Sequence, residues 1–280
     1  MRKNRKNNSC TWGNKICIAA FLLTCSLMLG GCGVKKEKEA DSELPKIVIG
    51  MDYFEPYSYQ ASDGEYKGID VELAKEAFRR LGYRPKFENI VWEDKDELLA
   101  DGTVDCLWSS YSMNGREDKY QWAGPYLYSR QMVVVKNESE IQTLSDLKGK
   151  RIAVQATTKA EDLFLHNIKS DLPQMQQVNC FSTTNEIYAA LRKSYVDAIA
   201  GHEAMLGSLV KEGKDAYRML DESIYKSELG VAFKKGTHEE VAADLTETLK
   251  KLQREGITEK IVTKYGLDAD EILPEGEQNE

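Results

Sequence analysis

Apolar and polar residues follow two spacings along this chain, one typical of strands and one typical of helices, and the two alternate. Residues 46–51 form a short apolar run that predicts a strand. Residues 68–82 predict a helix, with Asp70 as its N-cap and Gly82 at its C-terminal end. One face of this helix carries Ile69, Leu73, Ala77 and Leu81.

The same alternation continues to residue 108 and then restarts. A strand, a short helix and another strand are predicted over 84–91, 93–102 and 103–108. After an extended run at 131–137, a second unit has strands and helices over 145–156, 159–168, 176–181, 183–195 and 197–201. A second extended run covers 228–236, and two helices, 239–254 and 258–265, follow. Strands alternating with helices predict mainly parallel sheets covered by helices on both faces.

The two extended runs predict that the chain crosses between two lobes and later returns. We expect lobe 1 to comprise residues 45–135 plus 228–275, and lobe 2 to comprise 136–227. Two crossings make a two-strand hinge and leave a cleft, where small ligands commonly bind. Independent tandem domains would instead predict a linker rich in Pro or Gly near Lys136, and the sequence has none there.

The first 31 residues differ from the rest of the chain. Within them, residues 1–15 hold five basic and no acidic residues. An apolar run follows that is shorter than the ~20 residues of a membrane span. Residues 1–31 therefore predict a secretory signal peptide. The stretch "LGGC", ending at Cys32, resembles the bacterial lipobox, which implies lipidation of Cys32 and anchoring on the extracellular face of the cytoplasmic membrane. Residues 32–44 are charged and predict a flexible tether.

Without residues 1–31 the chain keeps 33 basic and 46 acidic residues, a net charge of −13. Such an acidic chain argues against nucleic acid as a partner. Cys106 and Cys180 lie in apolar runs of different halves, so we expect two buried free thiols rather than a disulfide. The sequence has no CxxC or Cys/His spacing, and neither a metal nor a cofactor is predicted.

Polar or aromatic residues follow several of the predicted strands, where ligand sites of open α/β sheets lie. Residues 108–117 read "WSSYSMNGRE" and offer three serine hydroxyls and the planar guanidinium of Arg116. They fit either a solvated turn or a socket for a small anion, and in both cases a helix is expected to start at Asn114. Further candidates at other strand ends are Tyr53, Phe54, Tyr57, Tyr59, Thr157, Thr158, His202 and Glu203.

Several of these stretches occur in the order found in the family 3 extracellular solute-binding proteins, the polar amino-acid receptors of ABC importers. The stretches that carry this resemblance are "GIDVELAKEAFRRLG", "VDCLWSSYSMNGRE", "AGPYLYSRQMVVVK", "DLKGKRIAVQATTKAE", "VDAIAG" and "IVTKYG". The resemblance runs from about Lys46 to Leu267. It implies an α/β, two-lobed periplasmic-binding-protein-like type II fold.

The resemblance also implies roles for individual residues. Arg116 would bind a ligand carboxylate, helped by Ser110 and Ser112. Thr158 would close over the ligand from lobe 2. One or more of Tyr53, Phe54 and Tyr57 would sandwich the ligand's side chain.

The sequence departs from the family's pattern at three places. The loop before Arg116 is one residue shorter, and "ATTK" stands where a glycine followed by Ser or Thr is common. The family's acidic residue for the ligand's α-amino group falls on His202, which is a poor partner for an ammonium when it is neutral. Three interpretations follow: Glu203 takes that role, the ligand is not an ordinary α-amino acid, or His202 is a helix-start residue that merely packs or faces solvent.

The expected function is that of an extracellular substrate-binding lipoprotein, a monomer that delivers an amino acid or similar carboxylate-bearing solute to an ABC permease. A dehydratase-like enzyme on the same fold would need a general acid or base in the cleft, for which His202 and Glu203 are the only evident candidates. The sequence has no nucleophile, zinc-protease or P-loop motif, so we expect no enzyme activity. A ligand-sensing module is the remaining alternative, although such modules are normally fused to a membrane helix.

Overall fold

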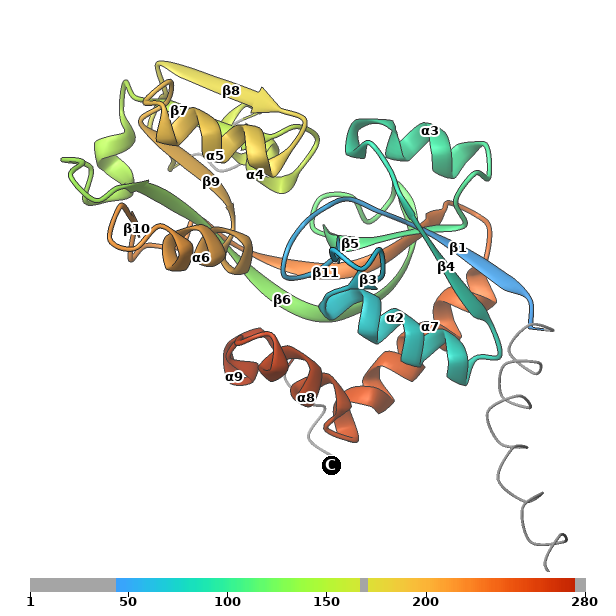
Figure 1. Cartoon of the computed structure of the whole chain (residues 1–280). Coiled ribbons are helices and arrows are strands. Elements are labelled where there is room, and N and C mark those ends of the chain that lie inside the picture. Colours follow the sequence, from blue (N-terminus) through green and yellow to red (C-terminus); the bar gives the residue numbers. More distant parts are fainter. Residues whose placement is uncertain (1–43, 167–170, 275–280) are drawn as a thin grey trace, which may run out of the picture. The chain divides into compact units, whose positions relative to one another are not determined.

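Two long antiparallel strands, β6 (Tyr120–Lys136) and β11 (Tyr225–Lys234), run from one half of the molecule to the other (Figure 1). The computed structural model describes residues 44–166 and 171–274. In one half β11 pairs with β5 (Cys106–Ser112), and in the other half β6 pairs with β9 (Ala198–His202). We call the half that contains β5 lobe 1 and the half that contains β9 lobe 2.

The strands of both lobes form one mixed sheet, in the order β4-β1-β5-β11-β6-β9-β7-β8 with β10 (Tyr217–Met219) added beside β6. In lobe 1, β4 (Arg84–Asn89), β1 (Lys46–Met51) and β5 are parallel. In lobe 2, β9, β7 (Arg151–Gln155) and β8 (Gln177–Phe181) are parallel. The predicted two-lobed α/β fold is confirmed, and β6 and β11 are the two crossing strands.

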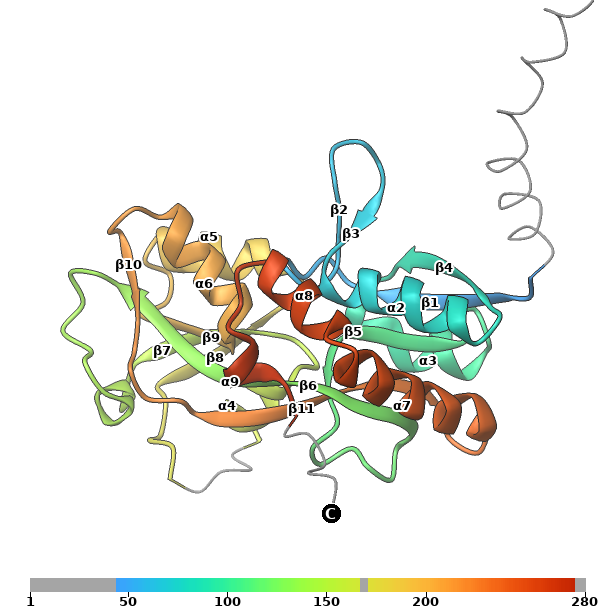
Figure 2. The same cartoon turned by 90° about the horizontal axis from the view of Figure 1, so that it is seen from below.

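Helices cover the sheet of each lobe (Figure 2). Those of lobe 1 are α2 (Ile69–Arg80), α3 (Lys95–Ala100), α7 (Glu239–Arg254) and α8 (Ile257–Lys264). Those of lobe 2 are α4 (Lys159–Phe164), α5 (Thr184–Arg192) and α6 (Glu203–Glu212). The smaller elements are β2 (Tyr59–Gln60), β3 (Tyr66–Lys67), η1 (Trp92–Asp94), η2 (Leu144–Leu147) and α9 (Ala269–Ile272).

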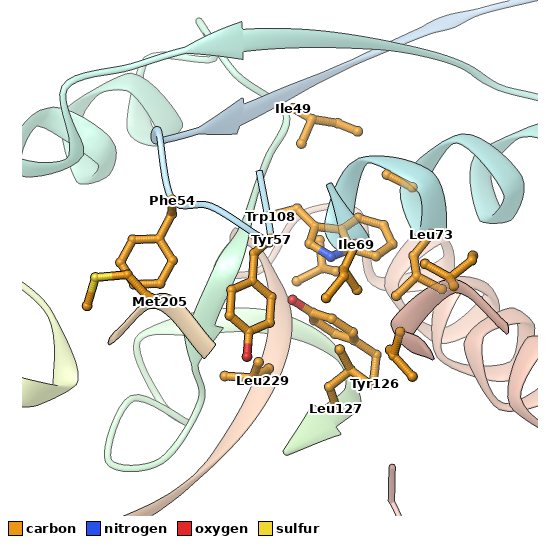
Figure 3. Packing of buried hydrophobic residues seen from close by; sticks show 14 of the residues in the cluster. Ile49, Phe54, Tyr57, Ile69, Leu73, Trp108, Tyr126, Leu127, Met205 and Leu229 are labelled. Atoms are coloured by element: carbon orange, nitrogen blue, oxygen red, sulfur yellow. The ribbon is translucent and has the colours of Figure 1, made fainter. Parts of the chain in front are cut away.

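One apolar cluster extends through both lobes and is continuous beneath the crossing strands. Along β6, Met132 and Val134 belong to this cluster, whereas Val133 and Val135 belong to a second cluster on the other face. This alternation is what a strand buried on both faces requires. Figure 3 shows Phe54 of lobe 1 beside Met205 of lobe 2 within the shared cluster.

Strand β5 bulges near its end. Its residues Leu107 and Tyr111 pair with Ala232 and Gly230, so three residues of β5 lie opposite one residue of β11. Ser110 in the bulge has a φ of 44°, and its amide donates to the carboxylate of Asp70 at 2.6 Å. A bulge removes ladder partners from backbone groups, and Asp70 supplies the missing acceptor.

The role expected of Asp70 as N-cap is wrong, because Gly68 occupies that position and Asp70 lies inside α2. The Asp70 side chain is buried and also accepts from the Tyr126 hydroxyl at 2.8 Å. The predicted C-terminal end of α2 is confirmed: Leu81 is the C-cap, and Gly82 follows with a φ of +77°.

Two further expectations are corrected. No helix starts at Asn114, because its side chain accepts from the Glu228 amide at 2.7 Å and Gly115 adopts a φ of +75° in the turn that follows. Both described cysteines are free thiols, but Cys180 is exposed and only Cys106 is buried.

The predicted signal peptide, the lipidation site at Cys32 and the tether up to residue 43 lie outside the described residues. Within the described ranges, none of the helices combines the length and the apolar character that crossing a membrane requires.

We predict that Gly68→Ala destabilises the fold far more than Gly64→Ala. Gly68 has a φ of +122°, and a Cβ there would lie 2.2 Å from the Tyr57 carbonyl oxygen, which is backbone and cannot move aside easily. Gly64 has a φ of +82° but nothing within 4 Å of such a Cβ, so its substitution adds only backbone strain. In urea unfolding we expect losses of about 1 kcal/mol for Gly64→Ala and on the order of 3 kcal/mol or more for Gly68→Ala. Equal losses would contradict the steric argument.

Candidate functional site

A small cavity lies between the lobes, at the carboxyl ends of β1, β5, β7 and β9. Its volume is about 20 Å³, which is room for about one water molecule. Lobe 1 contributes Asp52, Phe54, Trp92, Ser109, Ser110, Tyr111 and Ser112, and lobe 2 contributes Gln155, Thr158, Lys159 and His202. The lobes are therefore closed against each other at the place where sites of α/β sheets form.

The bulge in β5 places the predicted serines on this cavity. The Ser109 hydroxyl accepts from the Asp52 amide at 3.3 Å and lies 2.9 Å from the Ser58 hydroxyl, which joins the ends of β5 and β1. Ser110 and Ser112 are both buried. In the described part of the chain, the Ser112 hydroxyl has no hydrogen-bond partner. A buried hydroxyl without a partner is costly, so Ser112 is ready to bond a ligand atom.

Asp52 directly follows β1 and carries the one carboxylate among the described residues that line the cavity. Its Oδ2 accepts from Gln155 Nε2 at 2.5 Å, a bond between the lobes. Burial raises the pKa of Asp52 to about 6, although the hydrogen bonds from Gln155 and from the Tyr53 amide oppose that shift. Near pH 7 the group is therefore an anion in a dehydrated setting, which favours a cationic partner.

His202 ends β9, is the N-cap residue of α6 and is 6% exposed. Its Nδ1 lies 2.9 Å from the Ser129 hydroxyl, and its ring meets that of Phe54 edge to face at 5.6 Å. Burial, with a smaller effect from Arg116, lowers the pKa of His202 to about 3. His202 is thus a neutral part of the cavity wall and supplies no charge to a ligand's ammonium.

Thr158 and Lys159, at the start of α4, line the cavity from lobe 2. Thr158 is the N-cap residue, and its hydroxyl donates to the Gln155 carbonyl at 2.7 Å. The Lys159 side chain is only 2% exposed and reaches across to lobe 1, where Nζ donates to the Asn114 carbonyl at 2.7 Å. Burial is the main cause of a lowered pKa for Lys159, with Arg116 adding to it.

Arg116 does not line the cavity but lies at its rim. Its Nη2 contacts Asp162 Oδ2 of α4 at 2.6 Å, and its Nη1 donates to the Ser112 carbonyl at 3.1 Å. The guanidinium also lies over the Tyr111 ring, 5.1 Å from the centroid. In this closed conformation the predicted carboxylate partner is thus paired with a carboxylate of the protein itself.

Five other predicted residues do not line the cavity: Tyr53, Tyr57, Tyr59, Thr157 and Glu203. Tyr53 is 43% exposed. Tyr57 and Glu203 line a separate, larger groove of about 370 Å³ beside α6 and α9. There Glu203 forms an ion pair with Arg130. We take the smaller cavity as the site because the strand ends of both lobes converge on it, whereas the larger groove has no such set of strand ends.

Sequence reasoning had not assigned Asp52, Trp92, Tyr111, Gln155 or Lys159 to the site. Asp52 was the easiest to find, since it directly follows a predicted strand. Trp92 lies after another predicted strand, in a stretch that reads as the start of a helix. Among residues 44–166 and 171–274, no group of three His, Cys, Asp or Glu side chains could hold a metal ion.

Comparisons with known proteins agree with this architecture. Residues 47–268 match the family of bacterial extracellular solute-binding proteins, family 3. The L-cystine-binding protein TcyJ of Escherichia coli strain K12 is 26% identical over 223 residues, covering 78% of this chain and 82% of that protein.

Two solved structures are similar over most of the chain. The substrate-binding protein of an amino acid ABC transporter is 27% identical with a TM-score of 0.70, covering 79% of this chain and 98% of that one. A substrate-binding protein of an ABC uptake transporter from Streptococcus pneumoniae, solved with bound histidine, is 26% identical with a TM-score of 0.71. The match covers 84% of this chain and 98% of that one.

We predict that Asp52→Asn stabilises the protein more at pH 7.5 than at pH 4. Because the pKa of Asp52 is raised in the folded state from 3.8 to about 6, the folded state binds more protons than the unfolded state between these values. The stability contributed by Asp52 therefore falls as the pH rises through that window. Because the shift in pKa corresponds to about 3 kcal/mol, thermal unfolding should show a gain of about 6–12 °C at pH 7.5 and almost none at pH 4. The same gain at both pH values would contradict a raised pKa.

Proposed function

Because the chain belongs to the bacterial extracellular solute-binding proteins of family 3, we propose that it captures an amino acid or a similar small carboxylate-bearing solute for an ABC importer. The observation that carries this proposal is the cavity lined from both lobes at the strand ends. Charges of both signs, hydroxyls and aromatic rings meet there. A zwitterion with an organic side chain needs such a set of partners.

Each part of an amino acid has a suitable partner in the cavity. The ammonium is matched by the Asp52 carboxylate, and Phe54 and Trp92 supply aromatic surface for a side chain. The carboxylate is matched by hydroxyls of Ser110 and Ser112 together with the nearby cations.

Capture would proceed by opening and closing of the lobes. The cavity of about 20 Å³ is too small for an amino acid, so a ligand can enter only when the lobes separate. Since each lobe holds part of the site, a ligand binds the closed form better and shifts the population toward it. A permease that accepts the closed form would then receive loaded protein preferentially.

The rest of the proposal concerns the chain before the described residues. We propose that residues 1–31 are a lipoprotein signal peptide, that Cys32 is lipidated, and that residues 32–44 tether the monomeric receptor to the extracellular face of the cytoplasmic membrane. The support is the basic, then apolar, then "LGGC" sequence pattern.

We propose binding without turnover. Of the two candidate acid–base residues, His202 lines the cavity but is neutral and packed on Phe54, and Glu203 is paired with Arg130 outside the cavity.

We predict that the mature protein binds at least one of L-cystine, L-glutamate, L-histidine and L-arginine, and that Ser112→Ala weakens this binding about 10-fold. The Ser112 hydroxyl is buried without a partner in the described residues and can give its hydrogen bond to the ligand. A thermal-shift screen identifies the ligand, and isothermal titration gives the dissociation constants.

Ser208→Ala is the matched control, because that hydroxyl bonds the Ala204 carbonyl of its own helix and lies outside the cavity. Its affinity should stay within twofold of wild type. Saturable binding that Ser112→Ala leaves unchanged would contradict the assigned site, and the absence of binding to any small carboxylate would contradict the function.

A further inference from the structure

A buried lysine lies beside the aromatic wall of the cavity, and its ammonium lacks a full counter-charge. We propose that Lys95 binds a second acidic group, at the end of the ligand's side chain, so that the receptor selects diacidic solutes such as amino acids with an acidic side chain. This inference rests on the proposed function and narrows its substrate class.

Lys95 is the first residue of α3 and is only 2% exposed. A lysine is rarely buried to this extent, because its ammonium loses its hydration. Burial is the main cause that lowers the pKa of Lys95, to about 8, and the charge of Asp96 opposes this shift only in part. At pH 7 the side chain therefore still carries its positive charge, in a setting that stabilises it poorly.

The nearest carboxylate does not neutralise Lys95. Asp96 Oδ2 lies 3.9 Å from Lys95 Nζ, beyond hydrogen-bond distance, and the same oxygen accepts a bond of 2.8 Å from Lys119. The other oxygen of Asp96 accepts from the Tyr120 hydroxyl. Among the described residues, the remaining contact of the Lys95 ammonium is the ring of Trp92, whose centroid is 5.4 Å away. An added anion would supply both the missing acceptor and the missing charge.

Trp92 connects Lys95 to the ligand cavity. It lines the cavity together with Tyr111, and the two rings meet edge to face at 5.0 Å. After burial and the nearer charges of Asp96 and Lys119, the pKa of Lys95 also responds to Arg116 at the rim and to Glu161 of α4 in lobe 2. Lys95 is thus within electrostatic reach of both sides of the cleft. A ligand side chain that lies against Trp92 would direct its end toward this ammonium.

An acidic group suits this position better than other side-chain ends do. The ammonium of Lys95 has donors only, so a cation or a further donor would find no partner there. A neutral acceptor would accept a bond but leave the charge unbalanced. Glu161 is engaged within its own lobe, where its Oε2 accepts from the Thr157 amide at 2.6 Å. The second acidic group is also distinct from the ligand's α-carboxylate, which the proposed function assigns to the serine hydroxyls.

The substitution Lys95→Met tests the role in binding, because it removes the charge and keeps an unbranched apolar stem beside Trp92. The probes are L-aspartate, L-glutamate, L-2-aminoadipate and L-cystine, with L-asparagine and L-glutamine as carboxamide counterparts. By isothermal titration, wild type should bind one of the diacidic probes most tightly. Lys95→Met should lose about 10- to 100-fold for that probe and less than about threefold for the carboxamides.

The same variant should have the opposite effect on the stability of the ligand-free protein. Replacing a buried, incompletely neutralised cation with an apolar side chain removes its desolvation cost. We expect the melting temperature of Lys95→Met without ligand to rise by about 3 °C or more. A lysine retained only for packing would lower the melting temperature when it is replaced, so the sign separates the two roles.

Lys75→Met is the matched control. Lys75 also belongs to a helix of lobe 1 and also lies near an aromatic ring, with Nζ 5.8 Å from the centroid of Phe87. It lies outside the cavity and donates to the Tyr66 carbonyl at 3.2 Å. All probes should bind Lys75→Met within twofold of wild type. Circular dichroism melts check that each variant folds, and the ranking of probes by wild type needs no variant at all.

Two results would overturn the assignment. One is a wild-type protein that binds L-glutamine, L-histidine or L-arginine more tightly than every diacidic probe, which would leave the proposed function standing. The other is Lys95→Met binding its best diacidic probe within threefold of wild type. A wild-type protein that binds no small carboxylate contradicts the proposed function itself.

Discussion

The antiparallel pairing of β6 with β11 is the interaction on which both lobes depend. Each strand enters the core of both lobes, so the sheet, the apolar cluster beneath it and the helices that cover it are all aligned on this one ladder. The register shifts where β11 passes Gly230, opposite the bulge of β5. Because the same pairing fixes the strand ends of both lobes, it also fixes which residues can face each other across the cleft.

Across the cleft, the lobes are joined by side-chain hydrogen bonds and not by a backbone ladder. Side-chain bonds span it: Asp52 to Gln155, Arg116 to Asp162, Lys159 to the Asn114 carbonyl, and Ser182 to Glu93. Each polar group among these can bond water or a ligand when the lobes part, which offsets part of the free energy that the bond contributes to closure. A hinge built on a strong ladder and closed by exchangeable polar bonds suits a receptor that must open repeatedly.

The sequence predicted the elements of the fold well where apolar spacing is regular. The helix α7, with Ala242, Leu245, Leu249 and Leu252 buried, was predicted at its observed bounds. Local signals failed where a side chain bonds a group that is distant in the sequence. Asp70 accepts from the Ser110 amide in the bulge of β5, and Asn114 accepts from the Glu228 amide. Both residues are good caps in isolation, and only the fold shows that their oxygens are used elsewhere.

The candidate site could also be predicted only in part, because local sequence signals do not show tertiary contacts. Serines at a strand end could be predicted because three of them follow an apolar run, and Phe54 and His202 also lie where strand ends were expected. Lys159 and Trp92 were missed because a lysine at a helix start and a tryptophan in a short polar stretch resemble ordinary surface and core residues. Their places in the cavity depend on the closure of the lobes, which periodicity does not describe.

The positions of the charges have a consequence for how a ligand would lie. The described carboxylate that lines the cavity, Asp52, belongs to lobe 1, and the lining cation, Lys159, belongs to lobe 2. With His202 neutral at the start of α6, lobe 2 offers an ammonium no charge there. Under the proposed function, a zwitterion would place its ammonium at Asp52 of lobe 1 and its carboxylate between the serine hydroxyls of lobe 1 and Lys159 of lobe 2. Closing the lobes then brings both charges to their partners in one motion, and a solute that lacks either charge stabilises the closed form less.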